Sequence, residues 1–203
     1  MINRELYMEQ ITPFIDKPFV KVITGIRRCG KSVVLRLIRE ELLRRGVSED
    51  YIIYMNFESF EWIDMKEAKA LYAHIREATK ASGKYYILLD EIQEVTDWEK
   101  AVNAFLVDLD VDIYVTGSNS RLLSSEFSTY LAGRYVAFHI MTLSFREYLL
   151  FHDLPLTISV SDRKTEFLKY LRMGGFPAIH TANYDYNAIY KIVYDIYSSV
   201  ILR

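Results

Sequence analysis

Five short apolar runs, separated by helix-like patterns, constrain the fold of this chain more than any other feature of its sequence. The runs lie at residues 19–24, 51–57, 85–90, 111–116 and 134–140. In the segments between them apolar residues recur at spacings of three and four, as in amphipathic helices. We expect helices at residues 3–16, 31–45, 65–80, 97–109 and 120–131. Strands that alternate with helices predict an α/β fold with a mainly parallel sheet.

The alternation stops near residue 153. Beyond it only two helical patterns remain, at residues 162–173 and 186–202, and the second reaches the end of the sequence without a stop signal. We therefore expect a core at residues 1–153 and a helical lid segment, or the start of a truncated further domain, at residues 154–203. We also expect the natural chain to continue beyond this sequence.

The composition is that of a folded protein in a reducing compartment. Of the 203 residues 51% are hydrophobic and 26% are charged, which excludes a disordered chain. The single cysteine rules out an internal disulfide. The net charge of −2 gives no general attraction for nucleic acid, and no run of about 18 apolar residues is present to span a membrane. We expect a cytoplasmic protein with no membrane partner.

A glycine-rich octapeptide, Gly-Ile-Arg-Arg-Cys-Gly-Lys-Ser at residues 25–32, joins the first strand to the helix that follows it. A strand, this loop pattern and a helix are together typical of a phosphate-binding loop, because the loop N–H groups and the helix N-terminus converge on an anion. Lys31 is expected to reach the β- and γ-phosphates, and the Ser32 hydroxyl to bind Mg²⁺. The residues expected to line the nucleotide are Gly25, Ile26, Arg27, Arg28, Cys29, Gly30, Lys31, Ser32 and Val33.

The third strand ends in an acidic pair, Asp90 and Glu91. A phosphate-loop hydrolase needs a carboxylate at the end of a neighbouring strand to hold Mg²⁺, and Asp90 is expected to supply it. Glu91 is placed to orient or deprotonate an attacking water, which a protein that only holds a nucleotide does not need. The two motifs together make ATP hydrolysis the leading hypothesis.

The ends of two other strands carry small polar residues. Ser118 and Asn119 follow the fourth strand; if this strand lies between the first and the third, they can sense the γ-phosphate or its water. Such residues are also ordinary turn formers. Asn56 ends the second strand, where it either holds Glu91 inactive or bonds to its own backbone.

Arg134 opens the fifth strand and is expected near the edge of the nucleotide site. An arginine there can neutralise charge on the transferring phosphoryl group, in its own subunit or in a neighbour's. Simple solvation at the surface is the alternative.

Taken together, these motifs resemble a widespread prokaryotic family of AAA+-like ATPases. The resemblance rests on the octapeptide, Leu-Leu-Asp-Glu-Ile-Gln at 88–93 with Trp98, Thr-Gly-Ser-Asn-Ser at 116–120, Leu-Ala-Gly-Arg at 131–134 and Leu-Ser-Phe-Arg-Glu-Tyr at 143–148. It implies a three-layer P-loop NTPase fold whose sheet order is 5-1-4-3-2. It also implies a Walker A loop with Lys31 and Ser32, a Walker B pair at Asp90 and Glu91, a sensor at Ser118 and Asn119, and an arginine finger at Arg134. Members usually continue into a C-terminal domain of poorly defined role.

The sequence thus predicts an ATPase that uses ATP and Mg²⁺ and switches conformation with its nucleotide. The alternative is a scaffold or binding module with negligible turnover, including a DNA-associated one, and a homo-oligomer or a further protein or DNA partner stays open. A phosphotransferase is disfavoured because no acceptor-binding insertion is evident, and GTP because no Asn/Thr-Lys-x-Asp stretch is present.

Overall fold

The computed structural model describes residues 4–118, 122, 131–181 and 184–200. Its chain forms two compact units, which are described separately. The core unit consists of Glu5–Gly25 and Lys31–His139, and the helical unit of the described parts of Met1–Arg4, Ile26–Gly30 and Ile140–Arg203. Among the described residues, no helix is both long enough and apolar enough to cross a membrane.

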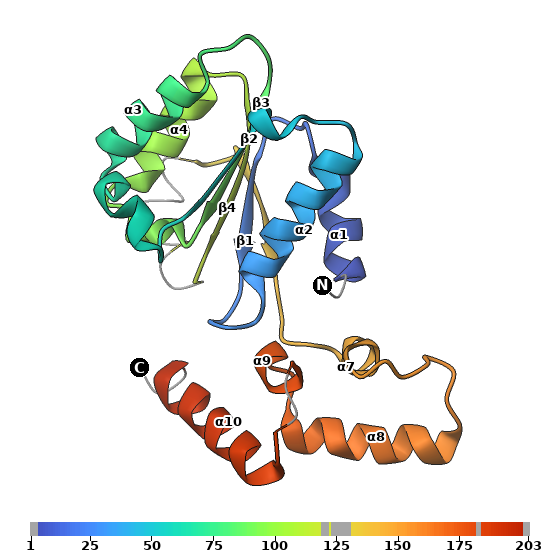
Figure 1. Ribbon diagram of the computed structural model, residues 1–203. Coiled ribbons are helices and arrows are strands. Elements are labelled where there is room, and N and C mark those ends of the chain that lie inside the picture. The colour runs from blue at the N-terminus through green and yellow to red at the C-terminus, as the bar shows by residue number, and fades with distance from the viewer. Residues whose placement is uncertain (1–3, 119–121, 123–130, 182–183, 201–203) are drawn as a thin grey trace. The chain divides into compact units, whose positions relative to one another are not determined.

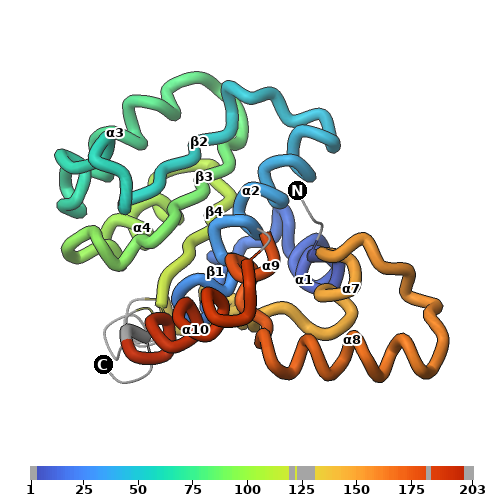
Figure 2. The backbone as a smooth tube through the Cα atoms, turned by 60° about the horizontal axis from the view of Figure 1, so that its bottom comes forward, coloured from blue at the N-terminus to red at the C-terminus, as the bar shows by residue number. Residues whose placement is uncertain are grey.

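The core unit is built on a five-stranded sheet in which every neighbouring pair of strands is parallel. The strands are β1 (Val20–Thr24), β2 (Ile52–Asn56), β3 (Tyr85–Asp90), β4 (Val111–Gly117) and β5 (Tyr135–His139). Their order across the sheet is β2-β3-β4-β1-β5, and Figure 2 shows β2, β3, β4 and β1 side by side in this order. The expected order 5-1-4-3-2 is therefore confirmed, because it is the same order counted from the other edge.

Helices cover both faces of this sheet, which gives the three layers expected. The helices are α1 (Glu5–Ile11), α2 (Lys31–Arg44), α3 (Ala68–Ala78) and α4 (Trp98–Asp108), joined by the short 3-10 turns η1 (Thr12–Phe14), η2 (Glu49–Tyr51), η3 (Phe60–Met65) and η4 (Ile92–Glu94). Figure 1 shows α1 and α2 on one face and α3 and α4 on the other. All six residues of β3 are buried, as its unbroken apolar sequence predicts for a strand covered on both sides.

Two helices of the core unit differ from their expected extents. The expected helix at residues 3–16 is split, since α1 ends at Ile11 and Pro13 lies in the 3-10 turn that follows. The helix expected from residue 65 begins only at Ala68, because the preceding residue, Glu67, is extended and forms a parallel bridge with Thr96. The helix expected at residues 120–131 falls mostly outside the described residues.

The helical unit contains α7 (Phe145–Phe151), α8 (Val160–Met173), α9 (Pro177–His180) and α10 (Tyr186–Val200). The capping box expected at the start of α7 is confirmed, because the Ser144 hydroxyl accepts from the Glu147 N–H while the Glu147 carboxylate accepts from the Ser144 N–H. This unit begins in the chain at Ile140, apart from its two short N-terminal segments. The expected division into domains at residue 153 stays a prediction.

Candidate functional site

The loop between β1 and α2 has the backbone of an anion-binding turn. Gly25, Arg28 and Gly30 have φ values of 154°, 67° and 105°, so three residues with positive φ lie between Thr24 and the first turn of α2. Alternation of this kind points successive N–H groups toward one side and forms a concave nest for anions. Ile26, Arg27 and Arg28 have exposed side chains, whereas Cys29 is fully buried. The backbone of this loop is therefore suited to phosphate, and the expected contacts of Arg27 and Arg28 with the nucleotide stay predictions.

Lys31 begins α2 and lies almost fully buried, with 4% of its surface exposed. Its Nζ donates to the Gly25 carbonyl over 3.3 Å and lies 3.3 Å from Glu91 Oε1. A buried ammonium needs such partners because desolvation of an isolated charge is costly. The structure thus brings together the lysine of the phosphate loop and the glutamate expected to act on water.

Asp90 is completely buried at the end of β3, and each of its carboxylate oxygens accepts a hydrogen bond. Thr116 Oγ1 donates to Oδ1 over 2.5 Å, and the Tyr54 hydroxyl donates to Oδ2 over 3.0 Å. Burial, together with the adjacent Asp90 charge, raises the pKa of Tyr54, so this phenol remains a donor. The two hydroxyls come from β2 and β4, the strands on either side of β3.

Glu91 follows Asp90 in a left-handed conformation, with a φ of 55°, which is uncommon for a residue with a long side chain. Three groups fix it there. Its N–H donates to Thr116 Oγ1 over 2.9 Å, its Oε2 accepts from the Gln93 amide over 2.5 Å, and Lys31 lies beside its Oε1. Backbone strain of this kind is maintained where the surroundings over-determine a functional conformation.

Gln93 carries a buried oxygen that the surrounding protein leaves unsatisfied. Among the described residues its Oε1 is the single buried side-chain nitrogen or oxygen atom without a hydrogen-bond partner. The amide is packed against Gly117, where an added Cβ would lie 2.1 Å from this oxygen. The glycine that ends β4 therefore makes room for the side chain that holds Glu91.

The polar residues expected beside this centre have different outcomes. β4 does lie between β1 and β3, so Ser118 is carried to the same edge of the sheet as Asp90, but its role as a sensor stays a prediction. Asn119 lies outside the described residues. Asn56 Oδ1 accepts the Glu58 N–H over 2.9 Å, so the local backbone interpretation applies and the amide that holds Glu91 belongs to Gln93 instead.

The donor set suits Mg²⁺ only if a nucleotide supplies part of the coordination. Within the described residues no group of three or more His, Cys, Asp or Glu side chains is arranged to hold a metal ion. The hydroxyl of Ser32 and the carboxylate of Asp90 are hard oxygen donors, and Mg²⁺ is commonly bound by one or two protein oxygens together with phosphates and water. These two residues are the oxygen donors that would hold an ion arriving with its nucleotide.

Sequence comparison agrees with this geometry. A family model described as an AAA domain matches residues 17–149, which include the phosphate loop, the acidic pair and all five strands. The chain belongs to the AAA domain family. Uncharacterized proteins of Haemophilus influenzae and Methanocaldococcus jannaschii share 41% and 35% identity over 204 and 184 residues. The chain covers 50% and 39% of these relatives, so it spans half of their length or less.

Solved structures share the fold of this AAA domain at low sequence identity. RuvB of Thermotoga maritima matches with a TM-score of 0.56 and 15% identity, over 89% of this chain and 60% of that one. AMPPCP-bound DnaA of Aquifex aeolicus matches with a TM-score of 0.57 and 16% identity, again over 89% and 60%. A nucleotide analogue is thus bound in one of these similar folds.

Arg134 lies at the N-terminal ends of the strands of the AAA domain sheet, whereas Lys31 and Asp90 lie at their C-terminal ends. It directly precedes β5, whose register with β1 runs from Val20 opposite Tyr135 to Thr24 opposite His139. The length of these five paired residues, at about 3.3 Å each, separates Arg134 by roughly 16 Å from the end of the strands that carries the phosphate loop. This placement corrects the expectation that Arg134 lies near its own nucleotide site, and action on a neighbouring subunit stays a prediction.

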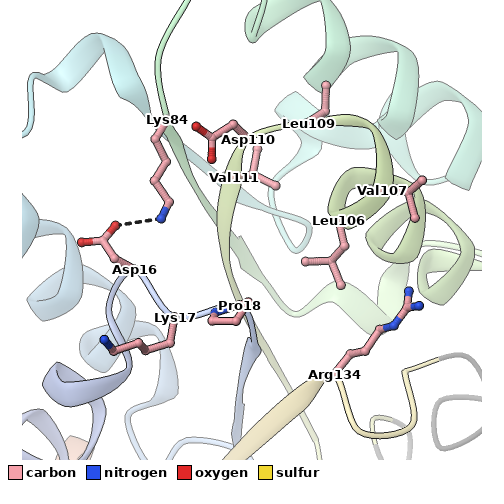
Figure 3. A pocket seen from close by; sticks show the side chains of 10 residues that line it. All are labelled: Asp16, Lys17, Pro18, Lys84, Leu106, Val107, Leu109, Asp110, Val111 and Arg134. Carbon is pink, nitrogen blue, oxygen red and sulfur yellow. Dashed lines mark ion pairs between the residues drawn. The ribbon is translucent and has the colours of Figure 1, made fainter.

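At the N-terminal ends of the strands Arg134 is exposed and lines a pocket of about 440 Å³ (Figure 3). Its Nη1 donates to Asn103 Oδ1 over 3.0 Å. Lys17, Lys84 and Asp16 line the same pocket, and Lys84 Nζ lies 3.1 Å from Asp16 Oδ1. The AAA domain therefore presents Arg134 on its surface, in a setting of mixed charge.

Sequence patterns alone missed three residues that hold the acidic pair. Thr116 and Gln93 stand inside motifs that were recognised, but a motif does not tell which carboxylate a side chain will contact. Tyr54 lies in the middle of β2 and reaches Asp90 only because β2 pairs with β3. Its position two residues before the end of a strand was the one available signal, and it is a weak one.

Proposed function

We propose that this protein is a Mg²⁺-dependent ATPase that converts ATP and water to ADP and phosphate. The observation that carries the proposal is the position of Glu91, which lies 3.3 Å from the phosphate-loop lysine and is oriented by Thr116 and Gln93. A carboxylate fixed beside the phosphate-binding lysine is what general-base activation of water requires. The single buried Cys29 and the lack of any disulfide pair favour the cytoplasm as its compartment.

Each residue of the centre has a role in this proposal. The loop N–H groups and Lys31 bind the β- and γ-phosphates, while Ser32 and Asp90 would hold Mg²⁺, which would offset the charge of the phosphates. Glu91 accepts a proton from the attacking water, and Ser118 and Asn119 contact the γ-phosphate or that water. Thr116, Tyr54 and Gln93 keep the two carboxylates in place.

The pair formed by Lys31 and Glu91 gives the nucleotide a means of switching the centre. Bound phosphates compete with the Glu91 carboxylate for the Lys31 ammonium, because both are anions beside one cation. Once Lys31 turns to phosphate, Glu91 keeps its bond from Gln93 and gains freedom to bind water. We infer that occupation of the site by ATP thereby changes the conformation of the acidic pair before hydrolysis.

Substitution of Glu91 tests the proposal directly. E91Q keeps the size of the side chain and removes its basicity, so we expect ATP binding to persist while phosphate release falls about 100-fold or more. E94Q is the matched control, because Glu94 is an exposed acid on the same turn. K31A is expected to abolish ATP binding with the melting temperature close to that of the wild type. Release of phosphate by E91Q at the wild-type rate would refute hydrolysis through Glu91.

A scaffold that binds ATP without turnover is the alternative, and the same experiment distinguishes it. Wild-type protein that binds ATP but releases no phosphate dependent on Glu91 would support this alternative. The arginines in and just after α2 do not favour association with DNA, since Arg44 and Arg45 share the Glu41 carboxylate and Arg39 pairs with Glu49. Two carboxylates thus offset part of the charge of these three arginines.

A further inference from the structure

Arg4 is a buried cation of the helical unit to which the proposed ATPase assigns no role. It is 2% exposed, and it is the largest of the described residues whose side chains are fully buried. A guanidinium cannot lose its charge in a protein, so its burial requires partners in fixed directions. The structure supplies such partners from two regions far from Arg4 in sequence, at Cys29 and at residues 141–147.

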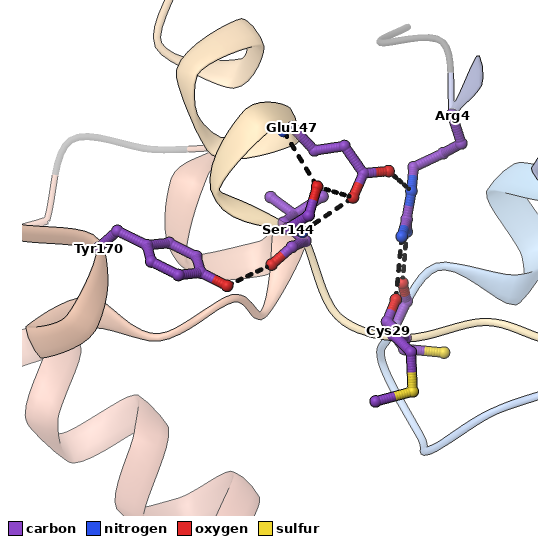
Figure 4. Close-up of polar contacts among 7 residues, drawn as sticks. Arg4, Cys29, Ser144, Glu147 and Tyr170 are labelled. Carbon is purple, nitrogen blue, oxygen red and sulfur yellow. Dashed lines mark hydrogen bonds and ion pairs between the residues drawn. The ribbon is translucent and has the colours of Figure 1, made fainter. Parts of the chain in front are cut away.

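Each kind of guanidinium nitrogen of Arg4 has its own acceptor. Nε donates to Glu147 Oε1 over 2.5 Å, Nη1 to the carbonyl of Cys29 over 2.9 Å, and Nη2 to the carbonyl of Met141 over 2.9 Å. Figure 4 shows Arg4 between the Cys29 carbonyl on one side and the Glu147 carboxylate on the other. The phosphate loop, the segment after β5 and helix α7 thus meet at one side chain.

The contact with Cys29 bears on the loop's ability to bind an anion. In a planar trans peptide the carbonyl of one residue and the N–H of the next point in opposite directions. Because Arg4 holds the Cys29 carbonyl, the Gly30 N–H is directed away from the guanidinium. A Cβ on Gly30 would lie 3.2 Å from Arg4 Nη1, which shows how closely the guanidinium approaches this peptide.

Glu147 fixes the other end of the contact. Its Oε2 accepts from the Ser144 N–H over 2.8 Å and from the Ser144 hydroxyl over 2.9 Å, while Oε1 accepts from Arg4. The carboxylate that caps α7 is therefore the one that balances the Arg4 charge. A buried ion pair is sensitive to the removal of either partner, because the remaining charge is left uncompensated.

We propose that Arg4 is a positioning residue for the nucleotide, which orients the peptide between Cys29 and Gly30 so that its N–H faces the phosphates and links this peptide to helix α7 through Glu147. The proposal rests on the proposed nucleotide site and adds to it a residue 21 positions before the loop begins. The N–H contact exists with ATP and ADP alike. Arg4 therefore affects nucleotide affinity far more than the rate of hydrolysis of bound ATP.

The affinity of a fluorescent mant-ADP, measured with Mg²⁺ in R4Q, R4K and E147Q, tests this role. We expect R4Q to raise the Kd about tenfold, since a hydrogen bond to a charged group is lost, while kcat at saturating ATP stays within about twofold of the wild type. R4K keeps the charge but not the three hydrogen-bond directions of the guanidinium, so its Kd is expected to lie between those of R4Q and the wild type. E147Q has one acceptor oxygen where Glu147 has two, so it keeps either the bond from Arg4 or the cap of α7 but not both, and we expect a rise of about three- to tenfold.

Y170F is the matched control for a merely structural effect. Tyr170, labelled in Figure 4, belongs to the same helical unit, and its hydroxyl donates to the Leu143 carbonyl over 2.8 Å. It takes part in no loop contact described for Arg4. We expect Y170F to lower the melting temperature and to leave the Kd within about twofold of the wild type. A Kd in R4Q equal to that of the wild type, or one in Y170F raised as much as in R4Q, would overturn the proposal.

Hydrogen exchange of the nucleotide-free protein provides a readout that does not depend on the proposed function. Amides of residues 26–33 are expected to exchange about tenfold faster in R4Q and R4K than in the wild type and in Y170F. Wild-type protein that fails to bind mant-ADP would refute the nucleotide site, whereas unchanged exchange in R4Q would refute the positioning of the loop by Arg4. The two failures are thus distinguishable.

Discussion

The hydroxyl of Thr116 contacts both acidic residues of the candidate site. It donates to Asp90 Oδ1 over 2.5 Å and accepts the Glu91 N–H over 2.9 Å. A hydroxyl has one proton and two lone pairs, so one group can be donor to the first residue and acceptor to the second. The orientation of the proposed metal ligand is therefore tied to the strained turn that carries the proposed base.

Replacement of Thr116 by valine is expected to lower kcat for ATP hydrolysis about 10- to 100-fold, because the shape is kept while both carboxylate-bearing residues lose a restraint. It also leaves a buried Asp90 oxygen without this donor, so the unfolding free energy should fall by about 1–3 kcal/mol. Phosphate release and urea unfolding measure the two effects. Y54F, which removes the other donor to Asp90 and does not touch Glu91, should affect kcat less. Equal kcat in T116V and the wild type would contradict this coupling.

At the scale of single residues, sequence reasoning identified the groups that carry chemistry and missed those that hold them. Lys31, Ser32, Asp90 and Glu91 are recognisable because each lies at a fixed place in a motif. The partnership of Thr116 with Asp90 depends on which strands become neighbours, and this is a property of the sheet. Local sequence carries no direct record of it.

Among the elements, β1 and β4 share a buried ion pair near their N-terminal ends, away from the phosphate loop. Lys21 and Asp112 are 0% and 2% exposed and are paired through Lys21 Nζ and Asp112 Oδ1. Asp112 Oδ2 also accepts from the Tyr114 hydroxyl over 2.9 Å and from the Asp16 N–H over 2.8 Å. Burial lowers the pKa of Lys21, and the Asp112 charge opposes this shift. The pair thereby joins the two central strands to the segment before β1.

Removal of the Asp112 charge is expected to destabilise the sheet, because D112N leaves the buried Lys21 ammonium uncompensated. We expect a loss of about 3 kcal/mol or more in the free energy of unfolding, measured with urea. The double variant K21M/D112N should lose less than the sum of its two single variants, as for residues in direct contact. The Kd for mant-ADP should not change, since the pair is remote from Lys31 along the strands. A D112N protein as stable as the wild type would show that the pair contributes nothing.

The elements themselves were largely predictable because their local signals agree with their packing. β3 occupies the expected residues 85–90, since an unbroken apolar run bounded by Gly83 and an acidic pair has few other solutions. α3 begins three residues later than expected, because the bridge between Glu67 and Thr96 competes with helical hydrogen bonds. The four-residue helix α9 was not predicted, since it is too short for apolar residues to recur at helical spacing.

At the scale of the whole molecule, the position of Arg134 has a consequence for assembly. Arg134 lies at the end of the strands remote from its own phosphate loop and is exposed there. An arginine that stabilises the transferring phosphoryl group must lie close to it, so an active Arg134 requires the site of a second copy. Such a contact joins different surfaces of two copies, which generates a ring or a filament rather than a closed two-fold dimer. A catalytic Arg134 therefore predicts a homo-oligomer.

Mixing two inactive variants tests this prediction. K31A is expected not to bind ATP, and R134A is expected to bind ATP but to hydrolyse it about 1,000-fold more slowly when an arginine acts in trans. In an equal mixture roughly a quarter of the interfaces join an intact loop to an intact Arg134, so about a quarter of the wild-type phosphate release should return. K84A is the matched control, because Lys84 lines the same pocket but pairs with Asp16; we expect it to stay active alone. A mixture no more active than its separate components would exclude action of Arg134 in trans.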